Sequence, residues 1–237
     1  MQSYFKGSTK DFFIAITILA DIRIYIVVLI LIFCLDSRDS SIYFMINFSF
    51  YSLFLNILRI AYRKPRPYME DPEIIPYLWS GEFGTPSGHA FFSAYLPTIL
   101  ALYYVNSSKR LNTIRNKIVA NWIYVGLFIF TIIISFTRVV NGVHTIDQVL
   151  FGLQIGWFWA FYIHWNLKNM MLNHINQFLL GEEFAKKEAW KHFILLLIVF
   201  VFFLSLFLIP YFIIKATYTP PGEWETTMRG HDHWKLK

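Results

Sequence analysis

Residues 193–214 read Phe-Ile-Leu-Leu-Leu-Ile-Val-Phe-Val-Phe-Phe-Leu-Ser-Leu-Phe-Leu-Ile-Pro-Tyr-Phe-Ile-Ile, a run without one charged side chain. A helix of about 20 mostly apolar residues is long enough to cross the hydrocarbon core of a bilayer. The run therefore predicts a membrane-spanning helix. Its proline, Pro210, predicts a kink, which neighbouring helices can tolerate in a bilayer.

Five further segments are apolar over a comparable length: 12–35, 42–62, 87–105, 118–136 and 144–165. Over all 237 residues the chain is 56% apolar and only 15% charged. A soluble domain carries about 25% charged residues because its surface faces water. We therefore predict an all-α, polytopic transmembrane helix bundle with about six spanning helices.

The segment 12–35 is the irregular one, because Asp21 and Arg23 interrupt it. A charge at the bilayer centre costs about 3 kcal/mol on insertion scales. Two arrangements avoid this cost. Either the two side chains pair with each other, or the segment breaks there into an interfacial piece and a short span.

The domain organisation along the chain consists of one membrane domain and a tail. We expect one transmembrane domain over residues 1–215, with its core at about 21–165, and a polar tail at 216–237. The connection 166–191 has apolar residues at roughly helical spacing, so its first half is predicted as an amphipathic interfacial helix. That connection and the tail are also the segments through which partner subunits would bind.

The charge pattern favours membrane lipids over nucleic acid as a partner. The formal net charge is +6, but the basic residues stand mostly in short gaps between apolar runs. This distribution is typical of loops that meet lipid headgroups. The single cysteine, Cys34, excludes an intramolecular disulfide framework.

Chain direction brings three polar clusters to one membrane face. The helix at 42–62 ends at the first cluster, and the helix at 87–105 begins at the second. That helix crosses away, and the next one returns to end at Arg138. The helix at 144–165 then starts on the same face, at His144.

The first cluster contains Arg59 and Arg66, which is followed by Pro67. Seven residues are about two helical turns, so both arginines lie on one side of the chain. Pro65 ends the helix before Arg66 and frees its guanidinium to turn inward. Guanidinium groups bind phosphate oxygens bidentately. The alternative is a basic anchor for lipid headgroups.

The second cluster, Gly84-Thr-Pro-Ser-Gly-His89, opens an apolar helix. Backbone N–H groups at a helix start, including that of Gly88, point outward and attract anions. His89 follows in the first turn, within reach of a leaving oxygen to which it could donate a proton. The alternative is plain helix capping by Ser87 with His89 as a bystander.

The third cluster is Thr137-Arg138, followed after five residues by His144 and then by Asp147. Positions i and i+3 share a helical face, so the Asp147 carboxylate can hold one imidazole nitrogen. The other nitrogen would then be free as a nucleophile. The alternative is a membrane histidine that is simply hydrogen-bonded.

Together the clusters resemble the signature motifs of the type 2 phosphatidic acid phosphatase and vanadium haloperoxidase superfamily. Its pattern is Lys, six residues, Arg-Pro; then Pro-Ser-Gly-His; then Ser-Arg, five residues, His, three residues, Asp. The chain keeps the order and the gaps at Arg66-Pro67, Pro86 to His89, Arg138 and His144.

The chain departs from this pattern at three positions. Arg59 replaces Lys and Thr137 replaces Ser, which preserves a charge and a hydroxyl. The pattern's Asp falls at Gln148, while Asp147 comes one residue early. Since one residue turns a helix by about 100°, only one of the two can take that position. Either Asp147 reaches His144, or Gln148 orients the ring as a neutral acceptor.

The resemblance implies a metal-independent hydrolase without a cofactor. His144 would attack phosphorus, His89 would protonate the leaving oxygen, and a group of five residues would bind the phosphate: Arg59, Arg66, Ser87, Gly88 and Arg138. A lipid phosphate or diphosphate is the expected substrate, and a sugar phosphate is the minority alternative, because glucose-6-phosphatase is a relative. The rival interpretation is a weakened member that serves as a structural subunit of a membrane complex.

No metal motif accompanies these clusters. Four acids lie in the connection after the first cluster, Glu70, Asp71, Glu73 and Glu82, and their spacing favours a solvated loop. Loop charge also suggests orientation, because the stretch 106–117 carries four basic residues and no acid. We therefore expect that stretch in the cytosol and the clusters on the lumenal face of the endoplasmic reticulum or another endomembrane. A mitochondrial inner membrane is the alternative.

Overall fold

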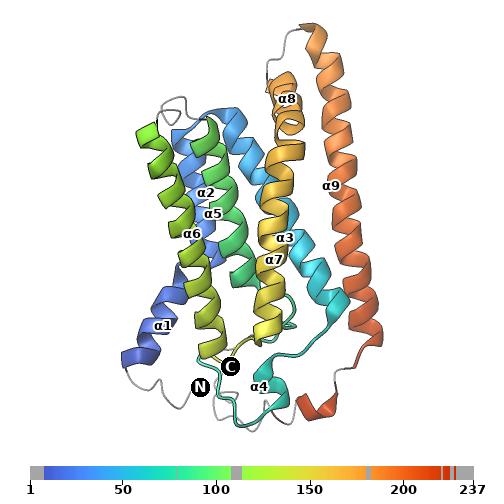
Figure 1. Ribbon diagram of the computed structural model, residues 1–237. Helices are drawn as coiled ribbons and strands as arrows, with labels where there is room; N and C mark the ends of the chain where they lie inside the picture. The colour runs from blue at the N-terminus through green and yellow to red at the C-terminus, as the bar shows by residue number, and fades with distance from the viewer. Residues whose placement is uncertain are drawn as a thin grey trace.

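In the computed structural model, the described residues are 8–78, 80–107, 114–179, 183–219, 221–224 and 227, and they form helices without a strand. The helices are α1 (Ser8–Ile18), α2 (Ile22–Leu35), α3 (Arg38–Tyr62), α4 (Pro67–Glu70), α5 (Gly88–Ser107), α6 (Ile114–Val140), α7 (Ile146–Tyr162), α8 (Lys168–Leu179) and α9 (Glu183–Thr217). The long helices run side by side (Figure 1). The predicted all-α bundle is confirmed.

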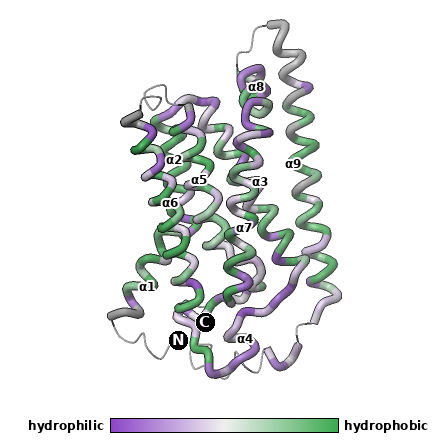
Figure 2. The backbone as a smooth tube through the Cα atoms, viewed as in Figure 1, coloured by the Kyte–Doolittle hydropathy of each residue, from purple (hydrophilic) through white to green (hydrophobic). Residues whose placement is uncertain are grey.

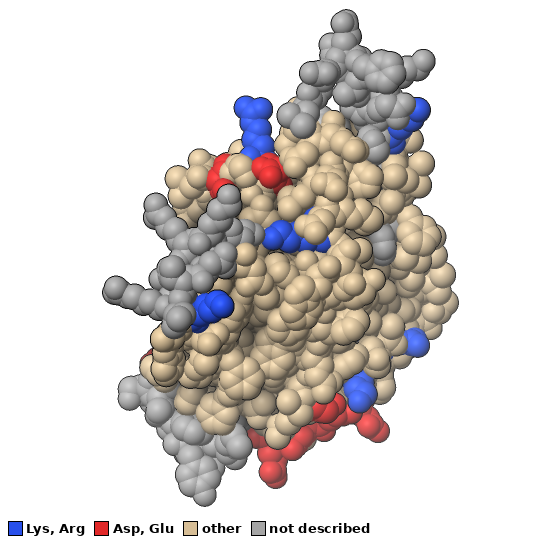
Figure 3. Space-filling model, turned by 45° about the horizontal axis from the view of Figure 1, so that its top comes forward, with Lys and Arg blue, Asp and Glu red and all other residues tan. Residues whose placement is uncertain are grey.

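Four described segments are long and apolar enough to cross a membrane: Asp11–Leu35, Arg38–Glu70, Lys117–Val140 and Phe193–Thr217. They match four of the six predicted spans. The bundle is green, and so apolar, along its middle (Figure 2), and one face shows a broad area without charged side chains (Figure 3). The chain is therefore a polytopic membrane protein.

The other two predicted spans form α5 and α7, which fall outside that set of four. These two helices pack extensively against each other at the centre of the bundle. Their contact surface contains small residues, Ala90, Ala94, Gly152 and Gly156, beside the apolar Val149 and Leu153. That they cross the membrane stays a prediction.

Glycines permit the close approach of α5 and α7. A Cβ at Gly152 would stand 2.7 Å from the Ser87 carbonyl oxygen, and one at Gly156 would stand 2.6 Å from the Phe91 carbonyl oxygen. Both distances are shorter than real Cβ contacts allow. The packing therefore fixes the start of α5, which carries the second cluster, against the start of α7, which follows the third.

For the irregularity at Asp21, the two predicted alternatives, an ion pair and a helix break, occur together. The helix breaks between α1 and α2, and Asp21 caps α2 by accepting a hydrogen bond from the Arg23 backbone N–H at 2.9 Å. The Arg23 guanidinium also pairs with the Asp21 carboxylate at 2.8 Å. The break places the ion pair beside the candidate site.

The first half of the connection after α7 is helical, and its place at the membrane interface stays a prediction. A π-helical turn, Ile163–Leu167, leads from α7 into α8, and α8 continues along α7 instead of lying across the bundle end (Figure 1). Its Ile175 is buried in the core. Past α9, Trp224 packs against a small apolar cluster of Tyr68, Met69 and Val143.

Candidate active site

One cavity of about 390 Å³ gathers residues from all three clusters. Arg59, Arg66, His89, Arg138 and His144 line it. Arg59 comes from α3, Arg66 from the turn before α4, His89 from α5, Arg138 from α6 and His144 from the loop before α7. The structure therefore brings together side chains that are up to 85 residues apart in the sequence, from Arg59 to His144.

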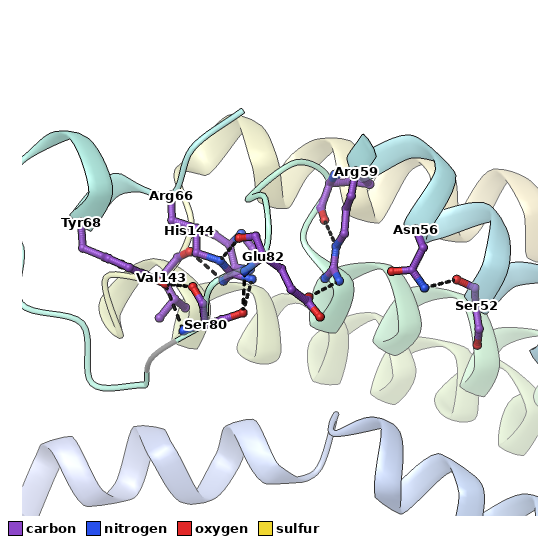
Figure 4. A network of polar contacts seen from close by, with 10 residues as sticks. Ser52, Asn56, Arg59, Arg66, Tyr68, Ser80, Glu82, Val143 and His144 are labelled. Carbon is purple, nitrogen blue, oxygen red and sulfur yellow. Dashed lines mark hydrogen bonds and ion pairs between the residues drawn. The ribbon is translucent and has the colours of Figure 1, made fainter. Parts of the chain in front are cut away.

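Arg66 binds the imidazole of His144. The guanidinium is buried, and its Nη1 lies 3.3 Å from His144 Nε2 (Figure 4). Three further hydrogen bonds hold it, to the Glu82 carbonyl (2.8 Å), the Val143 carbonyl (3.3 Å) and the Ser80 hydroxyl (3.1 Å). Because a guanidinium only donates, Nε2 accepts and carries the lone pair.

Gln148 contacts the other nitrogen of the same ring. Its Oε1 lies 3.1 Å from His144 Nδ1, while its Nε2 donates to the Pro65 carbonyl at 2.8 Å. The bond to Pro65 sets the amide orientation, so its oxygen faces the ring and His144 Nδ1 donates. The imidazole is thus neutral, with its unprotonated Nε2 turned toward Arg66.

The expected contact between Asp147 and His144 does not form. The Asp147 carboxylate accepts a hydrogen bond from the Thr145 hydroxyl and lies 3.7 Å from Lys64 Nζ, and its side chain is 63% exposed. The helical spacing argument fails because α7 begins only at Ile146, with Thr145 as its N-cap. His144 precedes the helix, so positions i and i+3 share no face there.

Gly84 makes room for the amide of Gln148. A Cβ at Gly84 would stand 2.6 Å from Gln148 Oε1 and 2.8 Å from the Pro65 carbonyl oxygen. The Gly84 N–H donates to the Lys64 carbonyl at 2.8 Å. The first residue of the second cluster thereby keeps the ring-orienting contact in place.

Arg59 pairs with an acid that the sequence analysis assigned to a solvated loop. Its Nη1 lies 2.5 Å from Glu82 Oε2 (Figure 4), and its Nε lies 3.5 Å from the Pro86 carbonyl oxygen. A Cβ at Gly88 would stand only 2.5 Å from Arg59 Nη2. The arginine therefore lies over the start of α5. No spacing rule marks Glu82, whose only sequence signal is its charge.

Two buried groups near the cavity have donors without a protein acceptor. Arg138 is 4% exposed and Ser87 is fully buried. The Arg138 Nε and Nη1 and the Ser87 hydroxyl find no hydrogen-bond partner among the described residues. A buried unpaired donor costs about 1–3 kcal/mol, and more when it is charged. An anion in the cavity would satisfy these groups.

A buried hydrogen-bond chain ties α1 to the third cluster. Asn141 Nδ2 donates to the Thr17 hydroxyl at 3.0 Å, and the Thr17 hydroxyl lies 3.0 Å from the Thr137 hydroxyl. All three side chains are at most 2% exposed. Because Thr137 precedes Arg138, this chain fixes the end of α6 that carries the arginine. Thr17 lies outside the motifs and Asn141 is one of the five unspecified residues between Arg138 and His144, so neither was expected.

The match to a known family agrees with this geometry. The family model of the PAP2 superfamily matches residues 41–171, which is more than half of the 237-residue chain. The chain belongs to the PAP2 superfamily. No curated protein and no solved structure matches it.

Membership in the PAP2 superfamily supports a function of the phosphatase type. The matched range runs from α3 into α8 and includes every expected site residue. It excludes α1 and α2, although Thr17, Asp21 and Arg23 also line the cavity. Among the described residues, no three His, Cys, Asp or Glu side chains gather as metal ligands would.

Proposed function

We propose that this PAP2 superfamily member is a metal-independent membrane phosphatase that hydrolyses a lipid phosphate or diphosphate through a phosphohistidine. The observation that carries the proposal is the state of His144. Its Nδ1 is held by Gln148, and its unprotonated Nε2 lies in the cavity beside the Arg66 guanidinium. A fixed nucleophile beside a phosphate-binding group is what phosphoryl transfer requires.

In the first step, the Arg66 N–H that His144 Nε2 accepts in this structure turns to the phosphate. The freed lone pair of Nε2 attacks phosphorus, and the bond from phosphorus to the leaving oxygen breaks. The step requires a protonated His89, which gives its proton to that oxygen. Arg59, Arg66 and Arg138 neutralise the equatorial oxygens, with the Ser87 hydroxyl and the Gly88 N–H as further donors.

In the second step, a water molecule attacks the phosphorus of the phosphohistidine and the P–N bond breaks. His89 takes the proton of that water and is ready to act as an acid again. The electron pair returns to His144 Nε2, and inorganic phosphate leaves. The arginines supply the positive charge that magnesium supplies in other phosphoryl-transfer enzymes.

A lipid substrate is favoured by the walls of the cavity. Ile14 and Ile18 of α1 and Leu78 line it together with the charged groups. A phosphate or diphosphate on an acyl, sphingoid or polyprenyl chain would place its head among the arginines and its chain beside apolar side chains. A sugar phosphate would leave these apolar side chains without a matching group.

The rival function is a weakened enzyme that serves as a subunit of a membrane complex. The neutral amide of Gln148 favours it, because an amide stabilises a charged phosphoimidazolium less than a carboxylate does. Against it, both histidines and all three arginines line one cavity. Partner binding through 166–191 or the tail, and residence in the endoplasmic reticulum or another endomembrane, belong to this proposal as expectations.

The deciding experiment traps the intermediate. Purified protein in a chelator is incubated with a labelled long-chain phosphate monoester and quenched in acid, and the label is located by peptide mapping. We expect label on His144, and neither label nor phosphate release from His144→Ala. Turnover in the wild type with label on another residue would exclude the mechanism. Absence of turnover would favour the structural subunit.

A further inference from the structure

A second concave site lies beside the catalytic cavity, between α3 and α9. It has a volume of about 350 Å³ and is mostly apolar. Its apolar lining comes from Ile60 of α3, Phe83 of the loop before α5, and Phe207, Tyr211 and Ile214 of α9. The other lining residues are Asn56, Arg59, Gly81, Glu82 and Lys215. We refer to this site as the α3–α9 groove.

The groove is continuous with the catalytic cavity. Arg59 and Glu82 line both. Arg59 is also the arginine that Glu82 engages at 2.5 Å, so this ion pair stands at the junction of the two spaces. A molecule bound in the groove therefore has one end at a phosphate-binding guanidinium.

The far side of the groove is formed by a predicted spanning helix, α9. Its α9 residues belong to the spanning segment Phe193–Thr217, whose apolar window is not buried by the rest of the protein. Hydrocarbon in this groove would contact apolar side chains along its length, in continuity with the lipid around α9. The charged residues of the lining are Arg59, Glu82 and Lys215, and an amphiphile with an anionic head would place that head at Arg59.

A comparison within the same molecule separates this groove from other apolar surface. A groove of about 330 Å³ between α2 and α3 is lined by residues such as Ile26, Phe33 and Met45. It shares no lining residue with the catalytic cavity. A chain lying there would have no phosphate-binding group at its end, whereas one in the α3–α9 groove has Arg59.

We propose that the α3–α9 groove binds the hydrocarbon chain of the substrate while its phosphate occupies the catalytic cavity. The chain enters sideways from the bilayer between α3 and α9, and the arriving phosphate displaces Glu82 from Arg59. This inference rests on the proposed phosphatase function and adds a chain-length requirement to it. Long-chain phosphate monoesters are then good substrates, and short-chain ones lack a groove contact.

Hydrolysis of two phosphate monoesters tests the groove. The purified protein is assayed in detergent with hexadecyl phosphate and with butyl phosphate. Ile214→Trp fills the groove, and Ile213→Trp makes the same change at the adjacent α9 residue, which is exposed and lies outside the groove. Gly81→Leu is a second blocking variant, because a Cβ at Gly81 meets nothing within 4 Å.

We expect Ile214→Trp and Gly81→Leu to lower kcat/KM for hexadecyl phosphate by about tenfold or more, since several methylenes lose their apolar contact. Activity toward butyl phosphate should stay within about twofold of the wild type, because groove contacts contribute little to so short a chain. Ile213→Trp should change neither. Equal losses on both substrates, or no loss, in a folded blocking variant would overturn the proposal.

A binding measurement tests chain binding in the groove independently of the catalytic activity. Gly81→Cys in a Cys34→Ser background provides one thiol at the groove, and its labelling by a maleimide is followed with and without each monoester. Protection by hexadecyl phosphate but not by butyl phosphate supports the groove even if the wild type hydrolyses neither. Hydrolysis of hexadecyl phosphate without protection overturns the groove and leaves the phosphatase function standing.

Discussion

At the residue scale, the hydrogen bond to His144 Nδ1 orients the imidazole that we propose as the nucleophile. Gln148 stands where the superfamily pattern has an aspartate, and its amide oxygen holds Nδ1 at 3.1 Å. Replacing Gln148 with Met keeps the volume and removes this hydrogen bond. We expect kcat to fall about 10–100-fold, as when other ring-orienting partners of a functional histidine are lost. Steady-state kinetics on one lipid phosphate measures the change.

The matched control is Asp147→Asn. Asp147 is exposed and engages Thr145 and Lys64, so its charge does not support the ring. The kcat of Asp147→Asn should remain within about twofold of the wild type, because exposed ion pairs contribute little. The opposite ranking of Gln148→Met and Asp147→Asn would show that the carboxylate reaches His144 in the working enzyme.

In the proposed mechanism, Glu82 would compete with phosphate for Arg59, with which it forms an ion pair in the cavity. Its side chain is 63% exposed, so the pair is partly screened by solvent. Removing the charge in Glu82→Gln should tighten inhibition by inorganic phosphate about twofold to fivefold, which is the range of an exposed ion pair. Inhibition constants measure this effect. Glu73→Gln, another exposed acid of the same loop, should leave the constant unchanged, and an equal gain there would indicate general electrostatics.

At the element scale, the contact between α5 and α7 depends on glycine. A Cβ at Gly156 would meet the Phe91 carbonyl oxygen at 2.6 Å and Ala94 Cβ at 2.9 Å, and neither can move alone. Gly156→Ala should therefore destabilise the protein by about 1–3 kcal/mol through overpacking. The melting temperature in detergent should fall by several degrees.

Gly126→Ala is the control for that substitution. Gly126 lies in α6, and a Cβ there meets nothing within 4 Å. Alanine raises helix propensity by about 1 kcal/mol relative to glycine, so the melting temperature should stay constant or rise. If both variants melt alike, close packing at Gly156 is not what holds α5 against α7.

The helices show which features of the fold can be predicted from the sequence and which cannot. Apolar length predicted the helices, and proline predicted that α3 ends before Arg66, which it does at Tyr62. The start of α7 was placed two residues too early. Helix starts depend on capping, and Thr145 caps α7, so counting from His144 favoured Asp147. The alternative left open, Gln148, is the residue that contacts the ring.

At the scale of the whole molecule, chain direction alone predicted that the three clusters meet, and they line one cavity. The residues that hold the cavity's side chains in place could not be predicted in this way. Thr17 and Asn141 join through a contact between residues 124 positions apart, and Glu82 reaches Arg59 across 23 positions. Such contacts follow from packing between helices, which no local spacing encodes.

Orientation in the membrane is the last property of the whole molecule to be tested. Short-loop positive charge is retained on the cytoplasmic side, and the stretch 106–117 has Lys109, Arg110, Arg115 and Lys117 without an acid. Residues 108–113 lie outside the described residues. At the opposite bundle end, Arg59, Arg66 and Arg138 line the cavity, where the proposed phosphate binding would account for their charge. We therefore predict that the site faces the lumen and the stretch 106–117 faces the cytosol.

Two single-cysteine variants in a Cys34→Ser background measure this orientation, since the exposed Cys34 would otherwise react. Asn112→Cys reports on the predicted cytosolic stretch, and Glu73→Cys reports on the exposed loop beside the site. In sealed endomembrane vesicles with the cytosolic face outward, an impermeant maleimide should label Asn112→Cys at once. Glu73→Cys should react only after permeabilisation. The inverse pattern would place the catalytic cavity in the cytosol, where its substrate would be a lipid phosphate of the cytosolic leaflet.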